Sequence, residues 1–548
     1  MVSRRLRARP ANRLLLAIAV LAWVLPHLCV PAWCQAQASS PITSSGLNTT
    51  VTKSATTFEI TGGTRPGNGP NLFHSFGEFG IPANHVANFL NDSGLATTNI
   101  LGRVTGGNPS NIFGTIQTTG FGNANLLMMN PAGIIFGPNS SLNVGGSVTF
   151  TTADYLRLGD GARFTAMPGP QDAAISSAPV AAFGFLGSNP SAIVVQGSQL
   201  ILAEGNAISL IGGNVHIGNG TLPNGSPQAA RLSAPGGQIN LVAAGSAGEV
   251  SASSPTGHLS DPALGAFTGL GSVSLSQGTT IGTSGNAAGR IVIRAGQFTM
   301  EDARLEAIST SITPNSVAAA PGSGDISIQV EEVALSHGAN VLTSTVNGIA
   351  GNIAFEAITL HSNVHQDGTP LPGAASVTIA STSTGLGGPG SIFIRGKTDR
   401  PADAIVLNNT RIITEVSHIA DPTAAPGNIE LSARQVELGN GTVLRSDTTG
   451  GADAGAITLN LDTLKTQAGP EGRVLISSDS NCGGQCVGGQ AGYITIQGIP
   501  GVTPPNTRLY RHVTTPDSEP NRPITYYFAQ DFDISGTDIH SDAIGNAP

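Results

Sequence analysis

Gly427-Asn428-Ile429-Glu430-Leu431 is one copy of a short phrase, Gly-x-apolar-x-apolar, that recurs through the second half of the chain. Copies of the phrase begin at Gly237, Gly289, Gly324, Gly351, Gly390, Gly427, Gly455 and Gly492. From residue 289 onward these glycines are 35, 27, 39, 37, 28 and 37 residues apart. Repetition at spacings of this order is the sequence signature of a solenoid, in which equivalent units stack on one another.

A second alternating phrase lies between successive glycines. Val333-Ala334-Leu335 leads through Gly338 to the segment 341–344, and residues 273–281 and 436–444 follow the same pattern. Alternation of apolar and small polar residues is the period of a β-strand with one buried face, and the Gly, Asn and Pro between phrases supply turns. No stretch of the chain shows a convincing helical period.

Stacking explains how such short strands would find a core. One strand pair cannot bury its apolar face alone, whereas coils stacked about 4.8 Å apart share a continuous apolar interior. The sequence therefore predicts an all-β fold, a parallel β-helix. At roughly 20 residues a coil, the chain after residue 38 would make about 25 coils and a rod on the order of 100 Å.

Composition supports this fold class and excludes others. Of the 548 residues, 72 are Gly and only 11% are charged, whereas ordinary domains have about 25% charged residues. Disorder is disfavoured because 39% of the chain is apolar. Collagen is excluded because Gly does not recur at every third position. The aromatic fraction of 5% suits a narrow interior filled by aliphatic side chains.

Residues 1–38 have the features of a signal peptide. Arg4, Arg5, Arg7, Arg9 and Arg13 precede an apolar run over 14–25, and Ala36-Gln37-Ala38 offers a cleavage site, so the mature chain would start near Ser39. The apolar run is shorter than the about 20 residues that a spanning helix needs, and no later segment is long enough. The mature chain would carry 20 basic and 34 acidic residues, a net charge of −14, which disfavours nucleic-acid binding.

The cysteines do not suggest a fold that is cross-linked by disulfide bonds. Two of the four precede residue 39, and Cys482 and Cys486 are the two that remain in the mature chain. Their spacing is compatible with a tight disulfide loop, a free thiol pair or half of a zinc site. An oxidising compartment favours the disulfide over free thiols, and zinc needs about four ligands whereas no further ligand lies nearby in sequence. We expect no metal and no cofactor.

Catalytic alternatives find little support in the sequence. Parallel β-helices can carry carboxylates that cleave polysaccharides, but Asp531, Asp533, Asp538 and Asp542 read as a solvated, turn-rich tail. Glu331 and Glu332 alternate across a strand and read as surface residues. His74 and the Met128-Met129 pair read as structural and core residues. No nucleophile motif, metal-ligand cluster or phosphate loop is present, and we expect no enzyme activity.

The first part of the mature chain carries a second, more specific pattern. It consists of five ordered blocks: Asn71-Leu72-Phe73-His74-Ser75-Phe76-Gly77-Glu78-Phe79, then residues 100–110, 112–116, 124–137 and 152–156. Together these blocks closely resemble the amino-terminal domain of the filamentous haemagglutinin family. Within them, Asn71, Phe73, Phe76, Phe79, Gly102 and Val104 are the secretion-domain motif residues.

The resemblance implies a fold and a route of export. Members of that family are secreted partners of two-partner secretion systems, with an amino-terminal right-handed parallel β-helix that the periplasmic domains of an outer-membrane β-barrel transporter recognise. Most members act outside the cell as adhesins, haemolysins or contact-dependent toxins. This chain has Ala132 where the family has Asn in Asn-Pro-Asn-Gly-Ile, and it lacks the upstream Asn-Pro-Asn-Leu motif.

Asn130, Pro131 and Gly133 are the most informative site in this domain. Pro fixes φ, Gly permits a positive φ, and the Asn side chain can bond nearby backbone amides, so these residues predict a tight turn. The turn lies between two apolar runs. It would act either as a corner of the solenoid or as a direct contact for the transporter.

These observations divide the chain into four expected segments. They are a signal peptide (1–38), a filamentous haemagglutinin-type secretion domain (39–265), a repetitive parallel β-helix (266–500) and a Pro-rich, acidic tail (501–548). We expect an exported passenger, adhesin-like and either surface-associated or extracellular. Its partners would be an outer-membrane transporter and a host-cell or carbohydrate receptor. The alternatives are a carbohydrate-active β-helix enzyme and a truncated carrier of a contact-dependent toxin.

Overall fold

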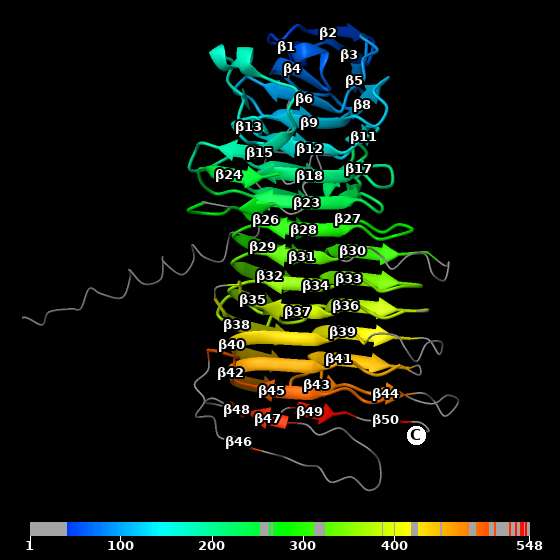
Figure 1. The fold of residues 1–548 in the computed structure, drawn as a ribbon. Coiled ribbons are helices and arrows are strands. Elements are labelled where there is room, and N and C mark those ends of the chain that lie inside the picture. The colour runs from blue at the N-terminus through cyan, green and yellow to red at the C-terminus, as the bar shows by residue number, and fades with distance from the viewer. Residues whose placement is uncertain are drawn as a thin grey trace, which may run out of the picture. The chain divides into compact units, whose positions relative to one another are not determined.

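The structure is a computed structural model. It describes residues 41–252, 262–264, 267–311, 324–385, 387–398, 400–417, 426–449, 452–481 and 489–502, together with 509–510, 525–527, 532–533, 537–541 and 543–544. Within these residues there is no α-helix, and short strands stack rung upon rung from the first coil to the last (Figure 1). This confirms the parallel β-helix that the repeat predicts.

Each coil passes through three strand positions, which we call faces 1, 2 and 3 in chain order. Face 1 consists of β4 (Asn71–Glu78), β6 (Asn99–Val104), β9 (Asn125–Met129), β12 (Val148–Thr151), β18 (Ala207–Gly212), β23 (Gln238–Ala243), β28 (Arg290–Arg294), β31 (Ile326–Gln329), β34 (Ile353–Glu356), β37 (Ile392–Arg395), β40 (Ile429–Gly439), β42 (Ile457–Gln467), β45 (Ile494–Gln497) and β47 (Thr525–Tyr527). Neighbouring strands of this face pair in parallel.

Face 2 follows directly in each coil. It consists of β7 (Ser110–Ile112), β10 (Ile134–Phe136), β16 (Ile193–Gln196), β19 (Val215–Gly218), β26 (Ser272–Ser276), β29 (Gln297–Glu301), β32 (Glu332–Ser336), β35 (Thr359–Ser362), β38 (Ala402–Asn408), the second halves of β40 and β42, and β48 (Phe532–Asp533). The long strands β40 and β42 therefore run through two faces without a break.

Face 3 closes the coil. It consists of β3 (Thr57–Gly62), β5 (Val86–Leu90), β8 (Thr115–Thr119), β11 (Ser141–Asn143), β17 (Gln199–Ile201), β22 (Arg231–Ser233), β27 (Thr280–Gly282), β30 (Arg304–Ser309), β33 (Asn340–Thr345), β36 (Val377–Ser383), β39 (Thr410–Val416), β41 (Val443–Thr448), β43 (Val474–Ser477), β44 (Ser480–Asn481), β49 (Thr537–His540) and β50 (Ala543–Ile544). All its pairings from β3 to β49 are parallel.

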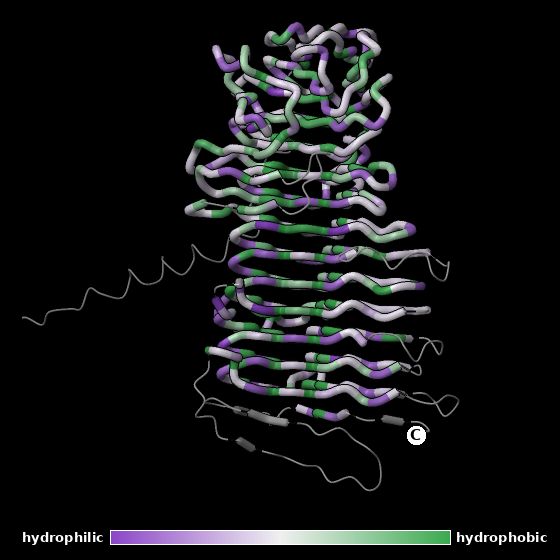
Figure 2. Tube along the Cα trace, viewed as in Figure 1, coloured by the Kyte–Doolittle hydropathy of each residue, from purple (hydrophilic) through white to green (hydrophobic). Residues whose placement is uncertain are grey.

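The phrase that predicts the fold occupies the same place in every coil. Its first apolar residue forms an interior column on face 1: Ile239, Ile291, Ile326, Ile353, Ile392, Ile429, Ile457 and Ile494. These side chains are almost completely buried, and each contributes about 1.5–3 kcal/mol by leaving water. Apolar positions accordingly recur from rung to rung along the stack (Figure 2).

The glycine of the phrase is required because a side chain at this position would collide with the neighbouring coil. A Cβ atom on Gly289 would overlap the carbonyl oxygen of Gly237 in the preceding coil, and Gly455 and Gly492 stand in the same relation to Gly427 and Gly455. Only glycine permits backbones to approach this closely. Buried hydroxyls of face 3 add to the corner. Ser446 Oγ donates to the Gly427 carbonyl at 2.8 Å, and Ser478 Oγ donates to that of Gly455 at 2.6 Å.

A different backbone device turns the corner between faces 2 and 3. In six successive coils one non-glycine residue adopts a positive φ of 44–57° there: Gln277, Asp302, His337, Asn363, Asn409 and Asn440. Asn and Asp tolerate this left-handed conformation better than most residues, because their short polar side chains bond locally. In three of these coils the glycine that follows, Gly278, Gly338 or Gly441, has a positive φ as well.

The expected coil length of roughly 20 residues is too short. Successive face 1 strands are 27 to 39 residues apart in the repetitive part, because one glycine phrase corresponds to one coil of three strands. Loops at the corner between faces 3 and 1 add to the coil length, and an estimate from strand stacking alone leaves these loops out, although the spacing of the glycines already contains them. In the described residues roughly half of the about 25 expected coils are therefore present.

Both ends of the described stack carry extra strands. At the first coil, β1 (Thr43–Ser44) and β2 (Thr49–Ser54) pair antiparallel with β4 and β3. At the last coil, β46 (Leu509–Tyr510) pairs antiparallel with β47, while β49 continues face 3. The prediction of a turn-rich tail over residues 531–542 is therefore wrong for residues 537–540. There the alternating sequence Thr-Asp-Ile-His forms β49, which pairs in parallel with β43 of the preceding coil.

An antiparallel sheet lies against the outside of face 1 in the first coils, and we call it the cover sheet. Its strands, in spatial order, are β14 (Arg163–Thr165), β13 (Tyr155–Leu158), β15 (Val180–Phe185), β24 (Gly248–Ser251) and β25 (Ala263–Leu264). Between it and face 1 lies a second apolar core, separate from the solenoid interior. Two short 3-10 turns, η1 (Pro66–Asn68) and η2 (Pro170–Ala174), and the hairpin of β20 (Gly220–Thr221) and β21 (Pro227–Gln228) complete the described elements.

Candidate functional site

Strand β4 holds three of the six predicted motif residues, and its two faces enter different cores. Phe76 points into the solenoid interior, where its ring centroid is 5.0 Å from that of Phe79, and Val104 pairs with it in the next coil. Phe73 points outward into the second core, with its ring centroid 5.0 Å from that of Phe164 in the cover sheet. The motif therefore ties the first coils to the cover sheet.

Gly102 is a motif residue for reasons of space. Its interior position lies between the side chains of Phe76 and Met128, and an added Cβ would lie 2.5 Å from Met128 Sδ. Met128 itself packs in the solenoid interior, and Met129 packs in the second core, as expected for core residues. A larger residue at 102 would displace a large neighbour.

Asn71 starts a ladder of stacked asparagines. Asn99 Nδ2 donates to Asn71 Oδ1 at 2.9 Å, and Asn125 Nδ2 donates to Asn99 Oδ1 at 3.1 Å. At the free end of the ladder, Asn71 Nδ2 donates to the carbonyls of Ser176 and Ala178, at 3.2 and 2.8 Å. The ladder fixes the register of three coils and holds the loop before β15.

Arg103 is the largest fully buried side chain among the described residues, with 1% of it exposed. Its Nη1 and Nη2 donate to the two carboxylate oxygens of Asp172, both at 2.6 Å. Its Nε donates to Ser75 Oγ at 2.9 Å, Nη1 also donates to the Thr165 carbonyl at 2.9 Å, and the guanidinium lies 5.2 Å from the centre of the Phe164 ring. A buried charge needs such complete pairing to be tolerated.

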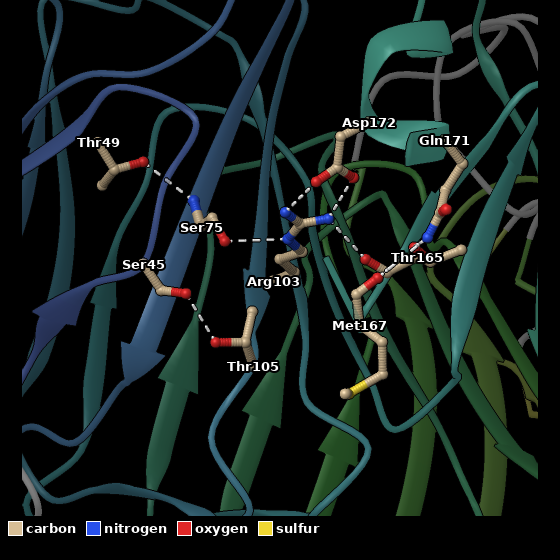
Figure 3. A network of polar contacts seen from close by, with 9 residues as sticks. All are labelled: Ser45, Thr49, Ser75, Arg103, Thr105, Thr165, Met167, Gln171 and Asp172. Atoms are coloured by element: carbon tan, nitrogen blue, oxygen red, sulfur yellow. Dashed lines mark hydrogen bonds and ion pairs between the residues drawn. The ribbon is translucent and has the colours of Figure 1, made fainter. Parts of the chain in front are cut away.

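The Arg103 network extends in both directions (Figure 3). Toward the amino-terminal strands, Ser75 N donates to Thr49 Oγ1 at 3.0 Å. Toward the surface, Gln171 Nε2 donates to Thr165 Oγ1 at 2.8 Å and to the Met167 carbonyl at 3.2 Å, while Thr165 Oγ1 donates to that same carbonyl at 2.7 Å. One polar chain thus runs from the first strands to residue 167.

The Asn130 turn is present as predicted and forms the corner between β9 and β10. Gly133 has a φ of 118°, its N–H donates to the Asn130 carbonyl at 3.0 Å, and the Ala132 N–H donates to Asn130 Oδ1 at 3.0 Å. Asn130 Nδ2 donates to Ser110 Oγ at 2.9 Å and to the Asn108 carbonyl at 3.1 Å. These contacts, and a side chain that is 1% exposed, support the corner interpretation, while recognition by a transporter stays a prediction.

His74 lies in the interior with the phenylalanines. Its Nδ1 is 3.3 Å from Thr49 Oγ1, and its ring stacks against Phe76 at 6.1 Å between centroids. Burial lowers the pKa of His74 to about 4, so the ring is neutral at physiological pH. This supports the structural interpretation of His74.

Where the structure describes their side chains, the carboxylates singled out in the sequence lie at the surface. Glu331 and Glu332 are both exposed, and Asp538 is ion-paired with Arg473 at 3.2 Å. Asp447 and Asp479 are neighbours in adjacent coils. Burial, and to a lesser extent the charge of Asp479, raise the pKa of Asp447 to about 6. Asp531, Asp542 and the cysteine pair 482 and 486 lie outside the described residues, as does the side chain of Asp533.

Metal and membrane features can be stated for the described residues alone. There, no three His, Cys, Asp or Glu side chains come close enough together to hold a metal ion. In the same part of the chain, no helix has the length and apolar character to cross a membrane.

Sequence reasoning missed Arg103, Asp172 and the cover sheet. Arg103 stands alone in an apolar strand, where an isolated charge resembles a solvated residue, and its partner is 69 residues away in a loop without periodicity. The usable signal was the alternation within the strand. It places Arg103 on the same outward side as Leu101, and Arg103 is in register with Ser75 and Met129 of the neighbouring coils.

Comparison with known proteins gives one family match, over residues 39–293, to a family described as TPS secretion domain. This match extends beyond the boundary expected at residue 265. Among solved structures, the chain is similar to the HMW1 secretion domain from Haemophilus influenzae, with 12% identity, a TM-score of 0.45, and 93% of this chain and 100% of that chain covered. A filamentous hemagglutinin secretion domain matches with 13% identity and a TM-score of 0.32, covering 68% of this chain and 97% of that one. No curated protein matches.

Proposed function

We propose that this chain, in which residues 39–293 match the TPS secretion domain family, is an exported two-partner secretion protein that acts as an adhesin-like extracellular structural protein. We further propose that a cognate outer-membrane β-barrel transporter recognises this domain, and that the chain ends outside the cell, either attached to the surface or released. The observation that carries the proposal is the secretion domain itself.

The regular coils support a structural role for the rest of the chain. The residues after 293 continue the interior columns of the secretion domain, so the described coils that follow the domain belong to the same stack. Coils that contact only their neighbours can fold progressively as they emerge. Folding outside would then favour outward movement of a chain that has no ATP at the outer membrane.

Export is tested with the full chain and the transporter encoded beside it. With the transporter, the chain should reach the medium or the cell surface with Ser39 at its start; without the transporter, or after deletion of residues 39–293, it should stay inside. Equal release with and without the transporter would contradict two-partner secretion.

The adhesin role needs a separate measurement. The purified mature chain, coated on a surface, should retain host cells or a glycan array above an uncoated control. Cleavage of a sugar polymer by the same preparation, without retention, would instead support the carbohydrate-active alternative.

A further inference from the structure

A groove crosses the outside of face 2 over the strands β38, β40 and β42, which belong to three successive coils (Figure 1). Its volume is about 840 Å³, a size typical of sites that hold small molecules. One wall is the loop 364–373, which follows β35, and the other is the loop 468–471, which follows β42. All the residues that line the groove come after residue 293, where the family match ends.

Both walls are held by asparagines that turn the corner between faces 2 and 3. The N–H of Leu371 donates to the Asn363 carbonyl at 2.9 Å, and the N–H of Glu471 donates to Asn440 Oδ1 at 2.9 Å. Asn363 and Asn440 are both among the residues with a positive φ. The same corners that shape the coils therefore fix the walls, so a ligand would meet a preformed site and would not have to order it.

Gly439 leaves the floor of the groove open although the fold does not require glycine there. Its φ lies outside the left-handed region, and an added Cβ would have no neighbour closer than 3.5 Å. The glycines of the repeated phrase differ, because a Cβ on them would collide with backbone. Position 439 is in register with Asn408 and Gln467 of the neighbouring strands. A side chain at 439 would therefore fit the fold and fill the space between these two amides.

Asn408 places a polar atom beside that space. Its side chain is 4% exposed, and its Nδ2 donates to the Asn363 carbonyl at 3.3 Å. Within the described residues Asn408 Oδ1 accepts no hydrogen bond, and it lies 3.5 Å from the point that a Cβ on Gly439 would occupy. A buried polar atom without a partner is costly. A bound molecule that places a donor above Gly439 would supply the missing partner.

The charges of the groove do not suit an anionic ligand. Among the described residues that line it, Lys465 is the basic one, whereas Glu437 and Glu471 are acidic. Lys465 Nζ donates to Glu437 Oε1 at 2.8 Å, so its charge is already compensated. An acidic polymer would meet no free cation there.

The floor does not suit a peptide strand or an acyl chain either. β38 pairs with β35 and β40, and β42 pairs with β40 and β48, so these strands offer no free edge to an added strand. An acyl chain would leave the polar groups of Asn408, Glu437 and Gln467 without partners. A sugar unit has hydroxyl groups for such side chains, and its C–H face can pack on the apolar wall formed by Pro370 and Pro372.

We propose that this groove is a binding site for a neutral oligosaccharide, with Asn408 and Gln467 as hydrogen-bonding residues above the open position at Gly439. The inference deepens the proposed function and rests on it, since it gives the adhesin-like chain a ligand class and a site.

The test uses the purified mature chain on an array of neutral oligosaccharides, with sulfated and sialylated oligosaccharides beside them. The neutral probe that binds best is then titrated against wild type, G439V and Q467A. G187V is the matched control for the first variant, because no heavy atom would lie within 4 Å of its Cβ. Q196A is the control for the second, since Gln196 is exposed at the end of β16, a face 2 strand of an earlier coil. Circular dichroism melts accompany each titration.

G439V should bind the neutral probe at least ten-fold more weakly with an unchanged melting midpoint, Q467A should bind it several-fold more weakly, and both controls should match wild type. If G439V melts earlier than wild type, Q467A decides. Wild-type affinity in both groove variants, an equal loss in both controls, or binding of anionic probes alone would overturn the inference. So would retention of host cells by a wild type that binds no neutral probe, and that result would leave the adhesin-like role intact. A wild type that retains neither cells nor any oligosaccharide would instead contradict the proposed function.

Discussion

Gly455 lies against the backbone carbonyl of Gly427 in the preceding coil, with no space for a Cβ atom between them. Gly455→Ala should therefore force two coils apart and lower the free energy of unfolding by at least about 2 kcal/mol. Gly187→Ala is the matched control, because no heavy atom would lie within 4 Å of its new Cβ, and it should change stability by less than about 0.5 kcal/mol. Urea titrations followed by circular dichroism measure both, since the two tryptophans precede residue 39. Equal stability of both variants would show that the glycine column is not required.

Asp172→Ala removes the partner of a fully buried charge. It should cost about 3–5 kcal/mol, because Arg103 would be left unpaired in an apolar site. The control is Asp403→Ala, which breaks an exposed ion pair with Arg400 and should cost less than about 1 kcal/mol. Both are measured by thermal melting of the mature chain. A loss at Asp172 no larger than at Asp403 would mean that the Arg103 network contributes little.

Asn130→Ala should lower secretion and stability together if the residue acts as a corner. Each lost side-chain hydrogen bond is worth about 1 kcal/mol, and the side chain makes three. Asn224→Ala removes a similar local bond to Ser226 N in an exposed hairpin and should have little effect on either property. Reduced secretion with an unchanged melting midpoint would favour direct contact with the transporter.

His74 makes the first coils sensitive to acid. Because its pKa is about 4 in the folded chain and about 6.5 in the unfolded chain, the unfolded state binds the proton first, so stability is complete above pH 6.5 and falls as the pH drops toward 4. The loss is on the order of 3 kcal/mol. His74→Met should remove this dependence, whereas the exposed His365→Gln should keep it. Melting midpoints measured between pH 4 and 7.5 test this pH dependence. The same change of midpoint with pH in wild type and His74→Met would contradict the prediction.

The contribution of Asp447 to stability has the opposite dependence on pH. Its folded pKa, about 6, lies above the ordinary 3.8, so its favourable contribution is complete below pH 3.8 and is lost as the pH rises through 6. Asp447→Asn should therefore raise the melting temperature at pH 8 by about one or two degrees and leave it unchanged at pH 4. The exposed Asp453→Asn is the control. A destabilised Asp447→Asn at pH 8 would show that the ionised carboxylate and Arg445 outweigh its burial.

The regular coils could be predicted because their determinants are local. Gly324, Ile326 and Ile328 lie within five residues and repeat, so period and turn chemistry show one strand and its corner without any distant partner. The coil length was also present in this repeat, as the 27 to 39 residues between successive glycines, but an estimate from strand stacking alone leaves out the loops that set it.

The cover sheet and the Arg103 network depend on distant contacts. β15 pairs with β24 across more than 60 residues, and Arg103 meets Asp172 only after β13 and β14 have folded back. Local secondary-structure propensity gives no information about such distant pairings. The motif blocks located the domain because the family resemblance carries this long-range information, but they did not reveal which member of each block faces which core.

The glycine column also makes the molecule modular in length. Every interior column passes through one residue per coil, so the segment from one column glycine to the residue before the next is a complete cassette. Excising residues 427–454 would bring Pro426 to Gly455 and return each column to register, with the rod shorter by one step of about 4.8 Å. Duplication of such a cassette would extend the reach of the protein by the same step, so its length can evolve in fixed increments while the composition of the interior stays constant.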